Sequence, residues 1–202
     1  MKIVKLFPLM LLMFMACMTM TSCSEEDDTV EEYANWQVVN ETRFQQLSDS
    51  VKLLLAENPD RKDWKRLKCW AKMTEEEGAD TDYILVKVLG EGDAAASDMP
   101  LYTDSISVHY QGRLLPSHSY AEGYVFDQSY YGTFNPDLCL PSKMQLNTLI
   151  SGFTTAVMNM HRGDHWLVYI PHQLGYGATA TAIPAYSLLI FDIALVDFWP
   201  LQ

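Results

Sequence analysis

The ionisable residues of this chain do not form a recognisable nucleophile or metal motif. His161 and His165 have the i, i+4 spacing that suits a metal on a helix, but Gly163 lies between them and no third ligand is evident. No G-x-S-x-G motif or phosphate-binding loop is present. The aromatic residues, among them Phe153, Tyr176 and Phe191, point instead to a pocket.

The segment 150–196 must hold most of these residues in place. Its first part, 150–160, repeats apolar side chains at the 3.6-residue period and predicts a helix, which Gly163 ends. Two predicted strands follow, 166–170 and 187–196, with a loop rich in Gly, Ala and Thr between them. The last strand alternates with period two, so one face carries Leu189, Phe191, Ile193 and Leu195.

Two further strands are predicted upstream, at 83–89 and 105–115. In the second, the alternation puts Tyr110 on the apolar face and His109 on the opposite face. We therefore expect His109 to be a surface or sheet residue that points away from Tyr110. Residues 63–73 are a candidate strand whose period is ambiguous.

Several short motifs occur in a fixed order: VHYQG at 108–112, FDQS at 126–129, ISGF at 150–153, IP at 170–171, LGYG at 174–177, IP at 183–184 and LIFD at 189–192. This ordered set resembles the FKBP family of peptidyl-prolyl cis-trans isomerases, and the match runs from about Tyr83 to Phe198. The resemblance implies an α+β fold, in which an antiparallel half-barrel sheet curls round one short helix. It also implies isomerisation of X-Pro bonds in polypeptide segments, a reaction that needs no cofactor, metal or nucleophile.

The resemblance also implies roles for individual residues. The pocket walls and floor would be Tyr110, Phe126, Phe153 and Phe191, and Leu149 and Ile150 would line the side. Two residues would donate hydrogen bonds to carbonyl groups of the bound segment, Tyr176 through its hydroxyl and Ile150 through its N–H. Asp127 would lie at the pocket edge, where it anchors Tyr110 or polarises the amide, and Ile183 would close the far side.

Three departures from the family pattern bear on activity. Phe153 stands where the family usually has tryptophan, and the loop 178–182 is short and lacks the usual bulky residue over the site. The segment 128–148 is longer than in compact members, which leaves open which of Phe134, Leu138 or Met144 reaches the pocket. These departures predict reduced catalysis and keep an alternative open: an FKBP-like protein that binds peptides, or acts as a chaperone, without useful turnover.

The N-terminus resembles that of a bacterial lipoprotein. Residues 1–22 hold two lysines and then an apolar run too short to span a membrane comfortably, which predicts a signal peptide. Cys23 would be the lipidated residue, with Cys17 as a rival, and residues 23–30 an acidic tether. The acidic stretch resembles the export signal of surface lipoproteins in Bacteroidetes-type bacteria. These features predict a lipid-anchored location in the cell envelope, with envelope proteins as clients.

Residues 31–75 are predicted to form a helical extension, ahead of an isomerase domain at 76–202. An amphipathic helix at 31–58 either packs on its own domain, which its shortness favours, or acts as a spacer or dimerising arm. A weaker alternative is a structural role in which this helix docks the protein into an envelope complex.

The formal net charge of −12 argues against nucleic-acid binding, which depends on neutralising phosphates. Of the cysteines, Cys69 and Cys139 remain after the N-terminal pair, and their spacing leaves both a disulfide and two isolated thiols open. Two isolated small hydrophobic residues are the favoured state.

Overall fold

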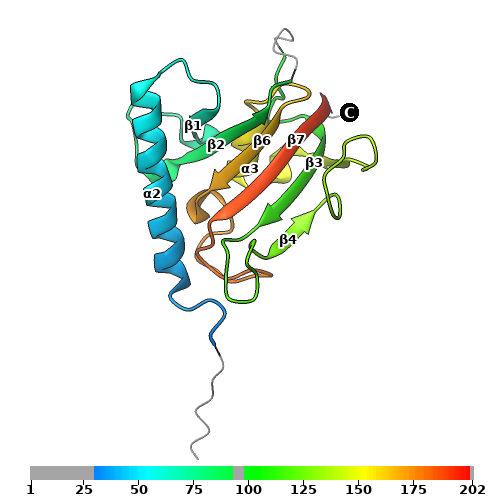
Figure 1. The fold of residues 1–202 in the computed structure, drawn as a ribbon. Helices are drawn as coiled ribbons and strands as arrows, with labels where there is room; N and C mark the ends of the chain where they lie inside the picture. Colours follow the sequence, from blue (N-terminus) through cyan, green and yellow to red (C-terminus); the bar gives the residue numbers. More distant parts are fainter. Residues whose placement is uncertain (1–29, 93–97, 201–202) are drawn as a thin grey trace, which may run out of the picture. The chain divides into compact units, whose positions relative to one another are not determined.

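The segments with alternating hydrophobicity form one antiparallel sheet. The computed structural model describes residues 30–92 and 98–200, so the predicted signal peptide and Cys23 lie outside the described residues. Seven strands pair in the order β1-β2-β6-β7-β3-β4, and β5 pairs with β3 at the other end from β4 (Figure 1). Their bounds are β1 Trp64–Lys68, β2 Tyr83–Gly90, β3 Ser105–Arg113, β4 Val125–Gln128, β5 Ser142–Gln145, β6 His165–Ile170 and β7 Leu189–Trp199.

The longest pairing of the sheet joins β3 to β7. It runs from Ser105 opposite Trp199 to Arg113 opposite Ile190, with a register shift between Ser107 and Val108. Beyond this shift, β7 continues past the predicted end at residue 196 to Trp199 and pairs with the start of β3. The predicted apolar face of β7 is confirmed, since all four of its members are buried: Leu189, Phe191, Ile193 and Leu195.

The short helix α3, Ser151–Val157, packs against the inner face of this sheet. It is shorter than the predicted 150–160, because residues after Met158 turn back to enter β6 and Gly163, with φ 88°, lies in that turn. The predicted apolar stripe nevertheless holds, since Phe153, Val157 and Met160 are all buried. The helix therefore delivers Phe153 to the concave side of the sheet.

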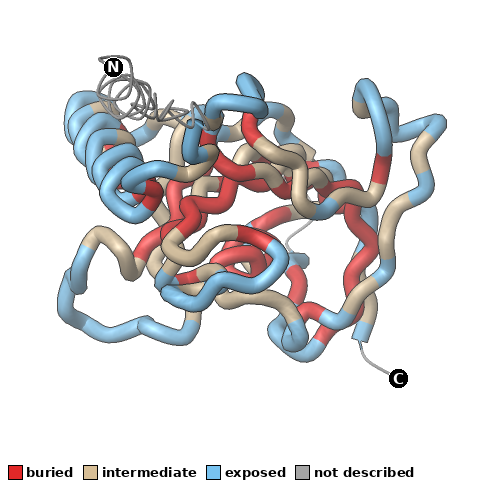
Figure 2. The backbone as a smooth tube through the Cα atoms, turned by 90° about the horizontal axis from the view of Figure 1, so that it is seen from below, coloured by how far each residue is buried: buried red, intermediate tan, exposed pale blue. Residues whose placement is uncertain are grey.

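The N-terminal helix α2, Trp36–Glu57, packs on its own domain. Its buried residues are Trp36, Asn40, Phe44, Ser48 and Val51, while its outer side is exposed (Figure 2). The hydrophobic pattern alone missed two of these positions, because Asn40 and Ser48 are polar. Where the prediction began the helix at residue 31, the chain makes turns up to Asn35, whose φ is 52°.

The candidate strand at 63–73 is resolved as β1 followed by a 3₁₀ turn at Trp70–Lys72. β1 pairs with β2 along its whole length, so the predicted extension at 31–75 is not helical throughout. The predicted boundary at 75/76 falls between two paired strands, and both belong to one compact unit that begins at Glu31.

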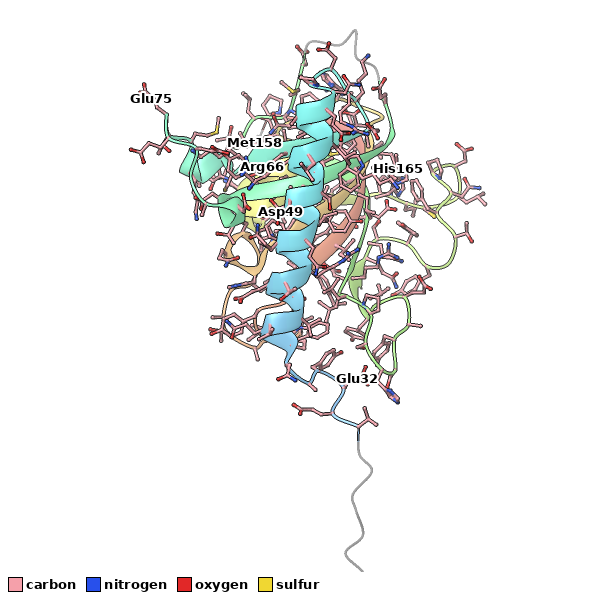
Figure 3. The ribbon with its side chains drawn as sticks, turned by 60° about the vertical axis from the view of Figure 1, so that its left-hand side comes forward. Glu32, Asp49, Arg66, Glu75, Met158 and His165 are labelled. Carbon is pink, nitrogen blue, oxygen red and sulfur yellow. The ribbon has the colours of Figure 1, made fainter. Side chains whose placement is uncertain are left out.

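Polar contacts fix α2 at both ends. The Glu32 carboxylate, just before the helix, accepts a hydrogen bond from the Ser119 N–H at 2.9 Å. Near the other end, Lys52 Nζ lies 2.5 Å from Asp80 Oδ1, which also accepts from Arg66 Nη2 at 2.9 Å. Figure 3 shows Glu32 below the start of α2 and Arg66 on the strand beside it. The helix is thus tied to a loop at its start and to β1 near its end.

The predicted fold class is confirmed: an antiparallel α+β sheet around one short helix, with a second helix at the N-terminus. Cys69 is buried, Cys139 is half-buried, and both are free thiols. In residues 30–92 and 98–200, no helix has the length and apolar character needed to cross a bilayer.

Candidate functional site

Three aromatic rings from three elements meet on the concave side of the sheet. Tyr110 of β3 and Phe191 of β7 point to this side, and Phe153 of α3 meets them from the helix. The Phe153 and Phe191 ring centroids are 5.2 Å apart and the planes are at 86°; Phe153 and Tyr110 are 6.0 Å apart, also at 86°. Edge-to-face pairs of this kind are favourable and hold the rings in fixed orientations. The result is an apolar floor with little freedom to rearrange.

Gly112 lets this cluster close. A Cβ at this position of β3 would lie 2.6 Å from Phe191 Cε1 and 2.7 Å from Phe126 Cζ, closer than carbon atoms approach without a clash. The Phe126 ring therefore packs edge-on against Phe191, with centroids 5.5 Å apart. The glycine of the VHYQG motif is required by packing and was not predicted as a site residue.

A cavity of about 160 Å³ opens over these rings. Its lining comes from β3, β4, β5, α3, β7 and the loops before α3 and after β6: Tyr110, Asp127, Met144, Thr148, Leu149, Ile150, Phe153, Tyr176 and Phe191. Seven of the nine predicted site residues outside the N-terminus line this one cavity. Apolar walls with a few polar groups at the rim are typical of a site for a small apolar ligand group.

The rim of the cavity carries Asp127 and Tyr176. Burial, and then interaction with the Asp127 carboxylate, raises the pKa of Tyr110 far above its ordinary value, so its hydroxyl keeps its proton. Burial and the Asp127 charge likewise raise the pKa of Tyr176. The Tyr176 side chain is 43% exposed, and its ring packs edge-on against Phe126 at 6.2 Å. The site therefore presents a protonated phenol donor that is partly open to solvent.

Ile150 lines the same cavity. As the N-cap residue of α3 it accepts a hydrogen bond from the Thr154 N–H at 3.0 Å. Its own N–H has no acceptor within residues 30–92 and 98–200. A peptide N–H left unpaired beside a cavity is available to a ligand carbonyl. The role of Ile150 as a donor to a bound segment stays a prediction.

Two predicted site residues do not line the cavity. Phe126 stands behind it and supports Tyr176 and Phe191 through ring contacts. Ile183, predicted to close the far side, lies in the core with 5% exposure, and its carbonyl accepts from the Thr181 N–H within a tight turn. The turn directs this side chain inward. Ile183 therefore belongs to the loop between β6 and β7, but it is buried in the core and does not line the cavity.

Two lining residues were not among the predicted site residues: Met144, which the sequence left open, and Thr148, which it missed. Met144 was one of three candidates in the long segment, and its pairing opposite Ile106 of β3 directs it to the pocket side. Thr148 carried no signal, because nothing in a lone threonine before a helix distinguishes a rim residue. Leu138, another of the three, is exposed.

The third candidate, Phe134, packs on the other face of the sheet. Its ring lies 5.4 Å from the ring of His109 and 5.2 Å from that of His165. His109 was expected to be a surface or sheet residue; it is a sheet residue but only 3% exposed, because the segment after β4 covers it. His161 and His165 contact different carboxylates, those of Asp164 and Asp192.

The fold and this cavity define a class of protein: an antiparallel sheet closed on a short helix, with an aromatic cavity between them whose lining residues include no cysteine, serine, lysine or histidine. The sequence of residues 97–196 matches the family described as FKBP-type peptidyl-prolyl cis-trans isomerase. The chain belongs to the FKBP family.

Known proteins agree with this assignment. The chain is 37% identical over 100 residues to a macrophage infectivity potentiator of Trypanosoma cruzi, covering 48% of this chain and 45% of that protein. It is 31% identical over 113 residues to the FKBP-type 22 kDa peptidyl-prolyl cis-trans isomerase of Escherichia coli, covering 55% and 48%. The chain thus spans about half the length of these curated relatives.

A solved structure shares the fold. The crystal structure of FkpA from Escherichia coli superposes with a TM-score of 0.55 at 23% identity, covering 82% of this chain and 62% of that one.

Proposed function

We propose that this protein catalyses cis–trans isomerisation of X-Pro bonds in polypeptide segments. The observation that carries the proposal is the cavity itself, in which Tyr110, Phe153 and Phe191 form an apolar floor below two donors, the Tyr176 hydroxyl and the Ile150 N–H. Membership of the FKBP family supports it.

The reaction asks for this kind of site. The barrier to rotation is about 20 kcal/mol and comes from amide resonance, which places charge on the carbonyl oxygen and keeps the nitrogen planar. A twisted amide has lost that resonance and is less polar, so an apolar floor favours it over the planar ground state. Donors that hold a neighbouring carbonyl add to catalysis only if they bind the twisted form better.

The test is isomerase activity of the purified protein on short X-Pro peptides. Tyr176→Phe removes one phenol donor, and Asp127→Ala removes the carboxylate beside Tyr110 and Tyr176. Each change is expected to lower kcat/KM by about 5- to 30-fold, since a hydrogen bond contributes about 1–2 kcal/mol and 1.4 kcal/mol is tenfold in rate. Tyr131→Phe is a matched control, because that tyrosine is 86% exposed and outside the cavity.

A folded protein without acceleration would overturn the enzyme proposal. Peptide binding without turnover would then establish the alternative, a binding or chaperone module. Phe153 stands where the family usually has tryptophan. Because a phenylalanine still provides an aromatic floor, we expect a protein without turnover to keep peptide binding rather than to lose all function.

We also propose that the protein is exported, lipid-anchored at Cys23 and active on envelope proteins. The apolar run near the N-terminus and the acidic residues after Cys23 support this. Metabolic labelling of a bacterial host with an alkyne fatty acid tests it: the wild type should be labelled and found in the membrane fraction, and Cys23→Ala should be neither. Labelling retained in Cys23→Ala and lost in Cys17→Ala would move the anchor to the rival cysteine.

A homodimer through residues 31–58 is a further proposal. The inner face of α2 is already used by its own domain, so a partner would have to meet the outer face, where Val38, Val39 and Leu53 are exposed. The test is the molar mass of the wild type and of Leu53→Glu by sedimentation equilibrium. A wild-type dimer that becomes a monomer in Leu53→Glu would support the proposed homodimer. A wild-type monomer at high concentration would exclude it.

A further inference from the structure

The segment between β6 and β7, residues 171–188, carries Tyr176 but contains no strand. Its own hydrogen bonds connect its two ends. The Gly177 N–H donates to the His172 carbonyl at 2.8 Å, and the Tyr186 N–H donates to the Gly177 carbonyl at 3.0 Å. Gly177, which follows Tyr176, is therefore hydrogen-bonded directly to Tyr186. We expect a displacement of the backbone at Tyr186 to displace Gly177 and Tyr176 as well.

Tyr186 adopts a conformation that tyrosine does not favour. Its φ is 60°, in the left-handed region, where the Cβ of an L-residue lies too close to its own backbone. Its ring packs edge-on against the ring of His172, with centroids 5.0 Å apart. Such backbone strain persists only where the surroundings hold it in place. The restraint must come from residues next to Tyr186.

Helix α2 supplies that restraint through two side chains. The Leu188 N–H donates to Asn40 Oδ1 at 2.8 Å, and the Trp36 indole Nε1–H donates to Ser187 Oγ at 2.8 Å. The Ser187 hydroxyl in turn donates to the Pro184 carbonyl at 2.7 Å. Asn40 and Ser187 are almost fully buried. The N-terminal half of α2 runs alongside this segment in Figures 1 and 3.

Asn40 has both of its polar groups satisfied. Its amide Nδ2 donates to the Trp36 carbonyl at 2.6 Å, which leaves Oδ1 free for Leu188. Asparagine is unfavourable inside a helix compared with leucine or alanine, so its place on the buried face of α2 calls for a specific partner. An apolar side chain there would leave the buried Leu188 N–H unpaired.

The packing between the helix and the segment is incomplete. A cavity of about 210 Å³ lies between them, lined on the α2 side by Asn40 and Phe44 and on the other side by His172 and Tyr186. His172 Nε2 also lies 3.4 Å from the carboxylate of Glu41. Apolar side chains of the two still share the core, among them Phe44 and Leu188, so the polar contacts with α2 add the directional restraint that packing around a cavity leaves incomplete.

We infer that α2 positions Tyr176 over the cavity, with Asn40 and Trp36 as positioning residues that act through Leu188, Tyr186 and Gly177. The inference rests on the proposed isomerase function for its consequence in catalysis. It gives the N-terminal helix a role in the site of its own chain, although the helix contributes no lining residue to that site.

The first test measures kcat/KM on a short X-Pro peptide in a double-mutant cycle. Asn40→Leu should lower kcat/KM about fivefold in the wild type but less than about twofold in Tyr176→Phe, because it acts through the Tyr176 hydroxyl. Trp36→Phe, which loses only the indole donor, should have a smaller effect of the same kind. Equal fold-losses in both backgrounds would overturn the inference.

A matched control separates positioning from stability. Val51→Ala truncates a fully buried residue on the same face of α2, far along the helix from Leu188, and should lower Tm while leaving kcat/KM within about twofold. Ser48→Ala, on the same face, should leave kcat/KM unchanged as well. A loss of activity in Val51→Ala equal to that in Asn40→Leu would reduce the role of α2 to general stability.

The second test does not depend on catalysis. Amide hydrogen exchange at Gly177 and Tyr186, measured relative to the core amide of Val168, should be at least about tenfold faster in Asn40→Leu and unchanged in Val51→Ala. Unchanged exchange in Asn40→Leu would overturn the positioning role. If the wild type shows no isomerase activity, the proposed function fails, and this comparison still decides whether α2 holds the segment.

Discussion

Gly112 of β3 lies directly opposite Phe191 of β7, and the absence of a side chain at Gly112 gives the Phe191 ring its place. Phe191 is in turn the ring that Tyr110, Phe126 and Phe153 all contact. The candidate site is therefore built round one phenylalanine, whose position depends on a glycine in the neighbouring strand.

Gly112→Ala should damage both the site and the fold. Its Cβ would meet Phe191 and Phe126 at less than 3 Å, so at least one ring must move. We expect stability to fall by about 1–3 kcal/mol, as for other overpacked cores, and kcat/KM to fall about tenfold or more. Urea denaturation and the peptide assay measure the two effects. Gly90→Ala is the control, because a Cβ there meets His165 Cβ at an ordinary 3.5 Å; equal losses in both variants would contradict the argument.

Phe153→Trp tests the departure from the family pattern at the pocket floor. The indole is larger and can extend into the cavity of about 160 Å³, where it would add apolar contact with a bound prolyl ring. We expect kcat/KM to rise about two- to fivefold, with a change in stability below about 1.5 kcal/mol, as for other tolerated apolar swaps. Phe198→Trp, at a half-buried phenylalanine of β7 outside this cavity, should leave kcat/KM within about twofold of the wild type. A fall in kcat/KM for Phe153→Trp would show that the floor is adapted to phenylalanine.

Asp80 should make the fold sensitive to acid. Burial opposes its ionisation, but hydrogen bonds from Lys52, Gln45 and Arg66 outweigh it and lower the pKa of Asp80 to about 2. Because the pKa is lower in the folded state, the stabilisation is complete above the unfolded value of about 4 and is lost as pH falls to about 2. Asp80→Asn should reduce the free energy of unfolding at pH 7 by about 1–2 kcal/mol, allowing for partial solvent screening.

The measurement is the free energy of unfolding against pH from urea titrations. The wild type should lose stability between about pH 4 and 2, and Asp80→Asn should lose less over the same window. Asp137→Asn, an exposed loop carboxylate, serves as control. If the free energy of unfolding of Asp80→Asn fell as steeply between about pH 4 and 2 as that of the wild type, Asp80 would not be the main source of the acid sensitivity.

His109 should contribute at higher pH, with the same sign. Burial lowers its pKa, and its Nδ1 has no partner among the described residues. Below about pH 6.5 the imidazole of His109 therefore binds a proton in the unfolded chain but not in the folded one. The free energy of unfolding falls as the pH drops. His109→Leu should flatten this part of the stability curve, whereas the exposed His118→Gln should leave it unchanged. If the free energy of unfolding of His109→Leu changed with pH as steeply as that of the wild type, a group other than His109 would be responsible for the proton uptake.

Much of the fold could be predicted because it depends on short-range periodicity. Alternating residues in β7 and β3 bury one face, and the helical repeat of α3 buries another, whatever the rest of the chain does. The motif order brought out Tyr110, Asp127, Phe153, Tyr176 and Phe191, which the structure gathers round one cavity.

The sequence alone therefore determined the strand faces, the core side of α3 and the aromatic composition of the pocket. Only the tertiary structure decided that Met144 rather than Phe134 reaches the cavity, and that His109 is covered. It also decided that Asn40 belongs to the buried face of α2. The physical reason is the same in each case: a side chain's burial depends on which distant segment covers it, and a polar residue is buried where a partner far along the chain completes its hydrogen bonds.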